Sequence, residues 1–540
     1  MPSQPRPTSA RLRSGGPVRS LRAGALLAST LLASALLVST LVGLALPAAP
    51  AAAQGLSRER IAAALPQLDA MAAKAVADGQ VPGLSIAIVH EDEVVFLKGY
   101  GLREAGKPGA VDADTVFQLA SFSKPISATI VAALVSEGVA DWDDTVAALD
   151  PAFQLHDAYP SQQVTVRDLL AHRSGLPGDA GNELEALGYD RATILERLRL
   201  VPPSSSFRAG YSYSNFGYTA GALAAAAPTG KPWEEVAREK LFGPLGMGST
   251  STRYADFIAR DNRAALHIGG IGRWAARLKR EPDAQAPAGG VSSNARDLAR
   301  WLRLELAGGT FDGRRLIAQE ALAATHQPVM ARGDNPVTGA ASFYALGWNV
   351  EFGRHGLSWG HAGAFSVGAR TLVTIYPEAK IGVVVLANAF PTGVPEGLAD
   401  NFLDLAFDGR LEKDWIGPWN AGYEGLFGPA VAAAQKRYAP RPDPLPAAAL
   451  SAYAGRYANA YVGVAEVAVA DDGLELRLGP EGKARFTLTH FNRDVFTYTP
   501  TPELPDMPVG VSFALGPDGR AEAVTIEDLN GFGMGTLERQ

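Results

Sequence analysis

Hydrophobic spacing along the chain changes from helical to strand-like within the first hundred residues. Residues 54–80 are rich in alanine and carry apolar positions spaced near 3.6 residues, which predicts one helix. Two apolar runs follow, at 83–90 and 94–97, on either side of the polar turn Glu91-Asp92-Glu93. Runs of this kind around a polar turn predict a β-hairpin.

The middle of the chain, from about 120 to 330, is dominated by helix and loop patterns, and strand patterns return at 343–354 and 370–388. Strands at both ends of a mostly helical segment are most simply joined in one antiparallel sheet that helices cover. We therefore expect an α+β domain over 54–410, with a helix-flanked antiparallel sheet and an all-helical subdomain.

The composition changes near residue 410. Residues 411–446 hold Trp415, Pro418, Trp419 and the run Pro440-Arg441-Pro442-Asp443-Pro444, which predicts a linker with a short helix. From 447 to 540, short alternating segments are separated by turns rich in glycine, proline and aspartate. This pattern predicts a small antiparallel β-barrel or sandwich.

The first 53 residues have the order of a secretory signal. Five arginines precede an apolar run at 23–46, and small residues lead to Ala51-Ala52-Ala53. We expect cleavage after Ala53 and a periplasmic or secreted protein. The apolar run of 24 residues is also long enough to span a bilayer, so an uncleaved N-terminal anchor is the alternative.

Charge and cysteine content exclude several classes of function. The formal net charge of −7 becomes −12 without the leader, which argues against nucleic acid and anionic membrane surfaces as partners. The absence of cysteine excludes disulfides, thiol catalysis and cysteine-ligated metals. The eight histidines show no metal-binding spacing, so neither a metal nor an organic cofactor is implied.

The strongest candidate for chemistry is the segment Phe117-Gln118-Leu119-Ala120-Ser121-Phe122-Ser123-Lys124-Pro125. Pro125 suits the first turn of a helix, so Ser121 is expected where a helix starts. Lys124 lies three residues later, on the same face. A serine hydroxyl needs a base to become a nucleophile, and a lysine whose pKa is lowered by burial can be that base. A capping serine beside an unrelated lysine is the simpler alternative.

Two further segments hold candidate site residues. In Tyr211-Ser212-Tyr213-Ser214-Asn215, the phenol of Tyr213 could act as a base if a cationic lysine lowered its pKa, and Asn215 could hold both a substrate carbonyl and Lys124. In Ser358-Trp359-Gly360-His361-Ala362-Gly363-Ala364, small residues would let a substrate backbone lie along an edge strand. Taken singly, these segments also fit an aromatic core loop and a glycine-rich turn.

The order and spacing of the three segments resemble the serine β-lactamase and penicillin-binding-protein superfamily. Ser-x-x-Lys is followed after about 90 residues by Tyr-x-Asn and after about 150 more by His-x-Gly. The Tyr-x-Asn motif is similar to that of class C β-lactamases and their esterase, DD-peptidase and D-aminopeptidase relatives. Further similar segments are Leu169–Pro177, Pro244–Gly248 and Ala288–Ser293. Tyr453-Ala454-Gly455-Arg456-Tyr457 resembles the start of a lipocalin-like barrel found in some members.

The resemblance implies a role for each motif residue. Ser121 would be the nucleophile, with Lys124 and Tyr213 sharing the proton transfers. The substrate would be bound by Asn215, His361, Gly363 and Ala364, with the backbone N–H groups of Ser121 and Ala364 as the oxyanion hole. No metal ligand is implied.

One motif departs from the family. His361-Ala362-Gly363 stands where β-lactamases usually carry Lys, then Thr or Ser, then Gly. A neutral imidazole holds a substrate carboxylate less well than an ammonium, and Ala362 supplies no hydroxyl. We therefore expect hydrolysis of esters, amides or D-amino-acid peptides, with weak or no β-lactamase activity.

Two other functions compete with this prediction. A catalytically silent receptor for penicillin or muropeptides would be expected to have lost one of the motif residues, and all are present. An α/β-hydrolase using Ser366 would need a helix after Gly368, where the pattern predicts a strand. The small-molecule or peptide substrate and the oligomeric state stay open at this stage.

Overall fold

The structure, a computed structural model, describes residues 56–471, 473–500 and 507–540. The predicted signal segment, 1–53, lies outside the described residues. None of the helices in these described ranges combines the length and apolarity needed to cross a bilayer.

The predicted α+β fold is confirmed, and its centre is an eight-stranded antiparallel sheet that joins the two ends of the first domain. The strand order is β2-β1-β13-β12-β11-β10-β9-β8, so the N-terminal hairpin pairs directly with β13. The bounds are β1 Gly83–His90, β2 Glu93–Gly101, β8 Met330–Asp334, β9 Ala341–Tyr344, β10 Asn349–Gly353, β11 Gly356–Phe365, β12 Ala369–Tyr376 and β13 Ile381–Ala387.

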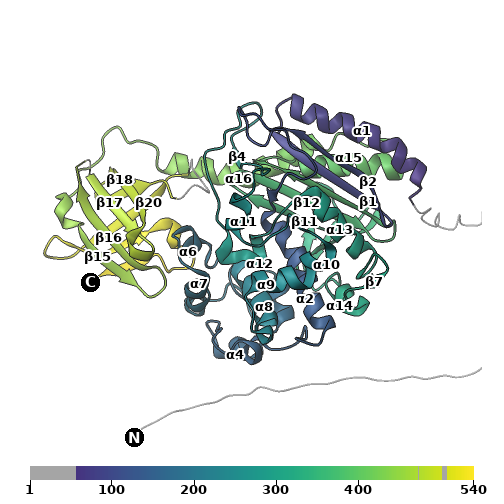
Figure 1. Cartoon of the computed structure of the whole chain (residues 1–540). Helices are drawn as coiled ribbons and strands as arrows, with labels where there is room; N and C mark the ends of the chain where they lie inside the picture. The colour runs from purple at the N-terminus through teal and green to yellow at the C-terminus, as the bar shows by residue number, and fades with distance from the viewer. Residues whose placement is uncertain (1–55, 472, 501–506) are drawn as a thin grey trace, which may run out of the picture. The chain divides into compact units, whose positions relative to one another are not determined.

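Helices cover both faces of this sheet. On one face lie α1 (Arg58–Ala77) and α15 (Val394–Asp408), which pack side by side (Figure 1). On the other face lie α2 (Ser123–Ser136) and α13 (Ala295–Leu306). Because β1 and β13 are buried on both faces, they read as continuous apolar runs and do not alternate.

The predicted helical subdomain lies between β2 and β8 along the chain. Its longest member is α8 (Asn215–Ala226), which packs against α2 and α5. The shorter helices are α3 Val146–Leu149, α4 Ala158–Gln163, α5 Val166–Leu170, α6 Asn182–Ala186, α7 Arg191–Arg197, α9 Trp233–Ala237, α10 Gly243–Leu245, α11 Tyr254–Ile258, α12 Ala286–Gly289 and α14 Gln319–Ala324.

The C-terminal region is a closed antiparallel barrel, as predicted. Pairing of β15 with β22 closes it, with Tyr457 opposite Arg539. Its strands are β15 Gly455–Asn459, β16 Gly463–Ala470, β17 Gly473–Leu478, β18 Ala484–Asn492, β19 Val495–Tyr498, β20 Val509–Leu515, β21 Ala521–Ile526 and β22 Thr536–Arg539. The segment predicted as a linker with a short helix instead contains the 22-residue helix α16 (Ile416–Arg437).

Candidate active site

Ser121 lies in a tight turn at the start of α2. A short 3₁₀ helix (Ala120–Phe122) leads directly into α2, and Pro125 falls in its first turn as the sequence predicts. The preceding residue, Ala120, has a φ of 49°, a left-handed conformation that is strained for a residue with a Cβ. Strain of this kind gathers at functional sites, where the surrounding structure enforces it.

Lys124 is completely buried and has three polar partners. Its Nζ lies 3.3 Å from Ser121 Oγ, 2.7 Å from Asn215 Oδ1 and 3.1 Å from the carbonyl oxygen of Ala288. Burial lowers the pKa of Lys124 well below its ordinary value. A neutral amine has two N–H donors and one lone pair, which match two oxygen acceptors and one hydroxyl. The lone pair is thus available to the Ser121 proton.

Tyr213 completes the group around Ser121. Its ring centroid is 4.4 Å from Lys124 Nζ, and its hydroxyl hydrogen-bonds to Ser121. Burial raises the pKa of Tyr213 far above that of an exposed phenol, the reverse of the lowering expected from a cationic neighbour. The reason is that burial favours the neutral form of Lys124 as well. The phenol is therefore a proton donor in the resting site.

His172 supports this arrangement without touching Ser121. Its buried ring lies 4.5 Å from the ring of Tyr213, and its Nδ1 accepts the backbone N–H of Ser214 at 3.0 Å. Burial lowers the pKa of His172 well below its ordinary value, so the ring is neutral. Ser214 in turn caps α8 by accepting the N–H of Gly217, which fixes Asn215 at the first position of that helix.

His361 is buried and neutral. Its Nδ1 lies 2.7 Å from the carbonyl oxygen of Ala362 and must donate to it, so Nε2 accepts from the hydroxyl of Tyr344 at 3.1 Å. Burial lowers the pKa of His361 well below its ordinary value. The third motif thus offers a substrate carboxylate no positive charge.

Half of β11 has a free edge beside the nucleophile. β10 pairs with β11 only as far as Gly360, whereas His361 to Phe365 pair with β12 alone. A Cβ added at Gly363 would overlap the carbonyl oxygen of Leu119 and lie 2.9 Å from Phe122 N, so this strand runs directly against the Ser121 turn. The free edge includes Ala364, the second residue predicted for the oxyanion hole.

The structure also brings in residues that the sequence analysis missed. Tyr344 bonds to His361, and the exposed Arg332 places its guanidinium 5.4 Å from the ring of Tyr211 and 6.0 Å from that of Tyr344. Arg332 lies in β8 and Tyr344 lies in β9. The position of these strands in the sheet depends on long-range strand pairing, which no local sequence motif predicts. By contrast, Ser366 follows β11 and leads into β12, not into a helix, so it does not form a nucleophile elbow.

Comparisons with known proteins agree with the fold. The family model described as Beta-lactamase matches residues 68–406, and a model for a domain of unknown function (DUF3471) matches residues 439–534. The chain is 28% identical to unguisins hydrolase ungD' of Aspergillus campestris, over 70% of this chain and 72% of that protein. It is 29% identical to penicillin-binding protein 4 of Amycolatopsis lactamdurans, over 57% of this chain and 81% of that protein.

Two solved structures share the fold at low sequence identity. The octameric penicillin-binding protein homologue from Pyrococcus abyssi is 21% identical with a TM-score of 0.53, over 88% of this chain and 99% of that one. SurE is 23% identical with a TM-score of 0.52, over 89% of this chain and all of that one.

Proposed function

Since this chain belongs to the β-lactamase family, whose members similar to it include proteins named as hydrolases, we propose that it is a serine hydrolase acylated at Ser121. The observation that carries the proposal is the buried Lys124 amine, which is held by Asn215 and Ala288 with its lone pair toward the Ser121 hydroxyl. A buried neutral amine within hydrogen-bond reach of a serine is what activation of that serine requires.

In the proposed acylation step, Ser121 Oγ attacks the substrate carbonyl carbon while its proton passes to Lys124 Nζ. Tyr213 gives its phenol proton to the leaving group as the carbonyl–leaving-group bond breaks. Lys124 then returns its proton to the Tyr213 phenolate, so that the serine proton ends on the leaving group overall. Water releases the acyl group by the reverse roles. The backbone N–H groups of Ser121 and Ala364 would hold the oxyanion.

The proposed substrates are esters, amides or peptides, including D-amino-acid peptides, with weak or no turnover of β-lactams. The neutral His361 and the missing hydroxyl at Ala362 support this choice, because a β-lactam carboxylate would find no ammonium there. The similarity to a protein named unguisins hydrolase is in keeping with it. Export through residues 1–53 to the periplasm or medium is part of the same proposal.

The test compares wild type, Ser121→Ala and Ser366→Ala with p-nitrophenyl butyrate and nitrocefin. We expect Ser121→Ala to lose at least about 10³-fold in kcat and Ser366→Ala to keep the wild-type rate. Nitrocefin kcat/KM should stay below about 10⁴ M⁻¹s⁻¹. Intact mass should show an acyl adduct in wild type and in Ser366→Ala, and none in Ser121→Ala.

Two outcomes would change the proposal. Ester turnover that survives in Ser121→Ala would show that the nucleophile is wrong. A stable penicillin adduct on Ser121 without turnover of any ester or peptide would favour the silent receptor, to which the similarity with a penicillin-binding protein also points.

A further inference from the structure

A cavity of about 410 Å³ lies on the face of the sheet opposite to Ser121. Val350, Val373 and Trp359 point to the α2 side, so the alternating residues of the same strands point to the α15 side. On that side β11 carries the small residues Ser358, Gly360 and Ala362, and β12 carries Thr374 between Leu372 and Tyr376, whereas β13 carries large aliphatic residues. The helices α15 and α16 therefore do not pack directly against this part of the sheet, which leaves the cavity between them.

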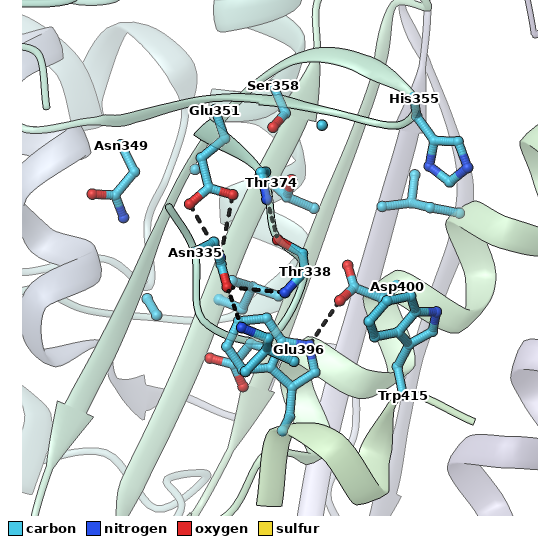
Figure 2. A pocket seen from close by; sticks show the side chains of 18 of the residues that line it. Asn335, Thr338, Asn349, Glu351, His355, Ser358, Thr374, Glu396, Asp400 and Trp415 are labelled. Atoms are coloured by element: carbon cyan, nitrogen blue, oxygen red, sulfur yellow. Dashed lines mark hydrogen bonds between the residues drawn. The ribbon is translucent and has the colours of Figure 1, made fainter. Parts of the chain in front are cut away.

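Two helices and a loop form the other walls. From α15 come Glu396, Asp400 and Asp404, spaced four residues apart on one face. At α16, Trp415, Trp419 and Tyr423 repeat the same spacing and give an aromatic wall. The loop 335–338 closes the remaining side. Figure 2 shows the carboxylates of Glu351 and Asp400 entering the same space, one from β10 and one from α15.

Most charges around the cavity are already paired within the protein. Arg370 Nε donates to Glu396 at 2.8 Å, and Arg354 pairs with Asp404 and Glu412. His355 lies 3.0 Å from Asp408, so this His and Asp group at the end of α15 is also internally satisfied.

Glu351 and Asp400 are the exceptions among the cavity carboxylates. Asp400 accepts a hydrogen bond from Trp419 Nε1 at 2.7 Å, and Glu351 accepts one from Asn335 Nδ2 at 3.2 Å. Within the described residues, neither has a lysine or arginine within 4.0 Å. Glu396, whose side chain is only 4% exposed, also leaves its Oε2 without a hydrogen-bond partner.

Burial raises the pKa of both unpaired carboxyls, that of Asp400 to about 7, with Glu396 and Glu351 adding to the effect. A carboxylate placed out of water without a cation lowers stability unless something else compensates it. Arg332 and Lys413 also line the cavity, but within the described ranges neither forms an ion pair with these two carboxyls, so a cation bound between Glu351 and Asp400 would compensate both directly.

We propose that this cavity binds a small organic cation, with its ammonium group between Glu351 and Asp400 and its apolar part against Trp419. The volume is in the range of small-molecule sites, which are mostly apolar with a few placed polar groups. Aromatic faces favour an organic ammonium. A calcium or magnesium ion requires six or more oxygen ligands, and indole rings add little to its binding free energy. The site is separate from Ser121 and does not depend on the proposed hydrolase activity.

The experiment is calorimetric titration of the full chain with benzylammonium chloride, with benzyl alcohol as the neutral counterpart. We expect benzylammonium to bind to wild type and to Ser121→Ala alike, and benzyl alcohol to bind at least about tenfold more weakly. Asp400→Asn and Glu351→Gln should each weaken benzylammonium at least about tenfold. Asp408→Asn, on the same helix but outside the cavity, should not change the affinity.

Melting temperatures with and without ligand distinguish lost binding from lost stability in a variant. Because each substitution removes a half-buried charge that has no ion-pair partner, Asp400→Asn and Glu351→Gln should melt no lower than wild type without ligand, and should lose the stabilisation that benzylammonium gives to wild type. Equal binding by wild type and both variants, or equal binding of benzyl alcohol, would overturn the proposal. Binding of CaCl2 or MgCl2 alone that is lost in both variants, with no benzylammonium binding, would replace the organic cation by a metal.

Discussion

Lys124 is surrounded by neutral hydrogen-bond partners, and this decides its protonation. None of the three groups at its Nζ is a carboxylate, so among the described residues no negative charge at hydrogen-bond distance offsets the cost of burying the ammonium form. Burial therefore lowers the pKa of Lys124, and the neutral partners Asn215 and Ala288 do not reverse this as a carboxylate would. The identity of residue 215 sets the pH at which the base becomes active.

Asn215→Asp tests this directly. A carboxylate 2.7 Å from Nζ favours the ammonium, so the pKa of Lys124 rises and a higher pH is needed to free its lone pair. The acidic limb of the kcat/KM profile for p-nitrophenyl butyrate should move upward by about 1–3 pH units. Asn215→Ser is the control, because it removes the amide without adding charge and should not move the limb upward. An unchanged limb in Asn215→Asp would mean that Lys124 is not the titrating base.

Site residues related by local spacing could be predicted from the sequence, whereas those that depend on long-range packing could not. Ser121 and Lys124 could be paired from the sequence because three residues on a helix fix their relation. The neutral state of Tyr213 could not be predicted, since it depends on burial that no local pattern reveals. Arg332 and Tyr344 were not predicted as site residues for a related reason, since only strand pairing brings them to the site.

Among the elements, β11 is the one whose position sets the width of the active site. Its residue Gly363 faces the Ser121 turn, and Thr371 of the neighbouring β12 donates to the carbonyl oxygen of Leu119 at 2.7 Å. The strand and the turn are thus fastened together at one point. A side chain at 363 would push them apart.

Gly363→Ala should therefore impair both stability and activity. The added Cβ overlaps the Leu119 carbonyl and crowds Phe122 N, so we expect a loss of about 1–3 kcal/mol in the free energy of unfolding. We also expect a fall of at least about tenfold in kcat/KM, since misplacement by an ångström costs more than this. Urea denaturation and ester kinetics measure the two effects.

Gly353→Ala, in β10 of the same sheet, is the matched control. Its Cβ would meet only the Cβ of Ala340, at an ordinary 3.4 Å, so stability and activity should stay at the wild-type level. Similar losses of stability and activity in both variants would show that any added methyl group destabilises the sheet and that the contact at Gly363 has no particular role.

Elements with strong local patterns were predicted well. The expected helix at 54–80 is α1, and the expected hairpin at 83–97 is β1 and β2. The edge-strand expectation for residues 358–364 was only half right, because β10 covers the first part of β11. The length of α16 was missed because the linker was predicted from the proline-rich composition of 411–446. Pro418 lies in the first turn of α16, the helix continues past Pro429, and the run Pro440–Pro444 comes after its end.

At the scale of the whole described chain, the barrel and the helical subdomain share one hydrophobic core. Leu184, Leu187 and Ile194 pack in the same cluster as Tyr461 and Val462 of the barrel. The hydroxyl of Tyr461 donates to Glu183 and accepts the N–H of Gly181 at 3.1 Å. Between these two residues, Asn182 accepts from Asn215 at 3.4 Å, so the barrel contacts a segment that touches the active site. The predicted likeness of this barrel to lipocalins stays a prediction.

This junction should make stability depend on pH through Glu183. Burial raises the pKa of Glu183 to about 7 from an ordinary 4.5. The folded state therefore favours the protonated form, and this stabilising contribution falls as the pH rises from 4.5 to about 7. Above that pH, the Tyr461 hydroxyl is the group that compensates the buried carboxylate.

Tyr461→Phe removes that compensation. We expect it to lower the free energy of unfolding by about 1.5–3 kcal/mol at pH 8, where the hydrogen bond reaches a charged acceptor, and by about 0.5–1.5 kcal/mol at pH 5.5, where Glu183 is protonated. Tyr457→Phe is the control, because that hydroxyl, on an equally buried ring, donates to the Tyr453 carbonyl and accepts from Arg539, so that no carboxylate takes part in its hydrogen bonds. Its cost should be the same at both pH values. Urea denaturation at the two pH values measures the difference, and equal pH dependence in the two variants would show that Glu183 does not titrate at this junction.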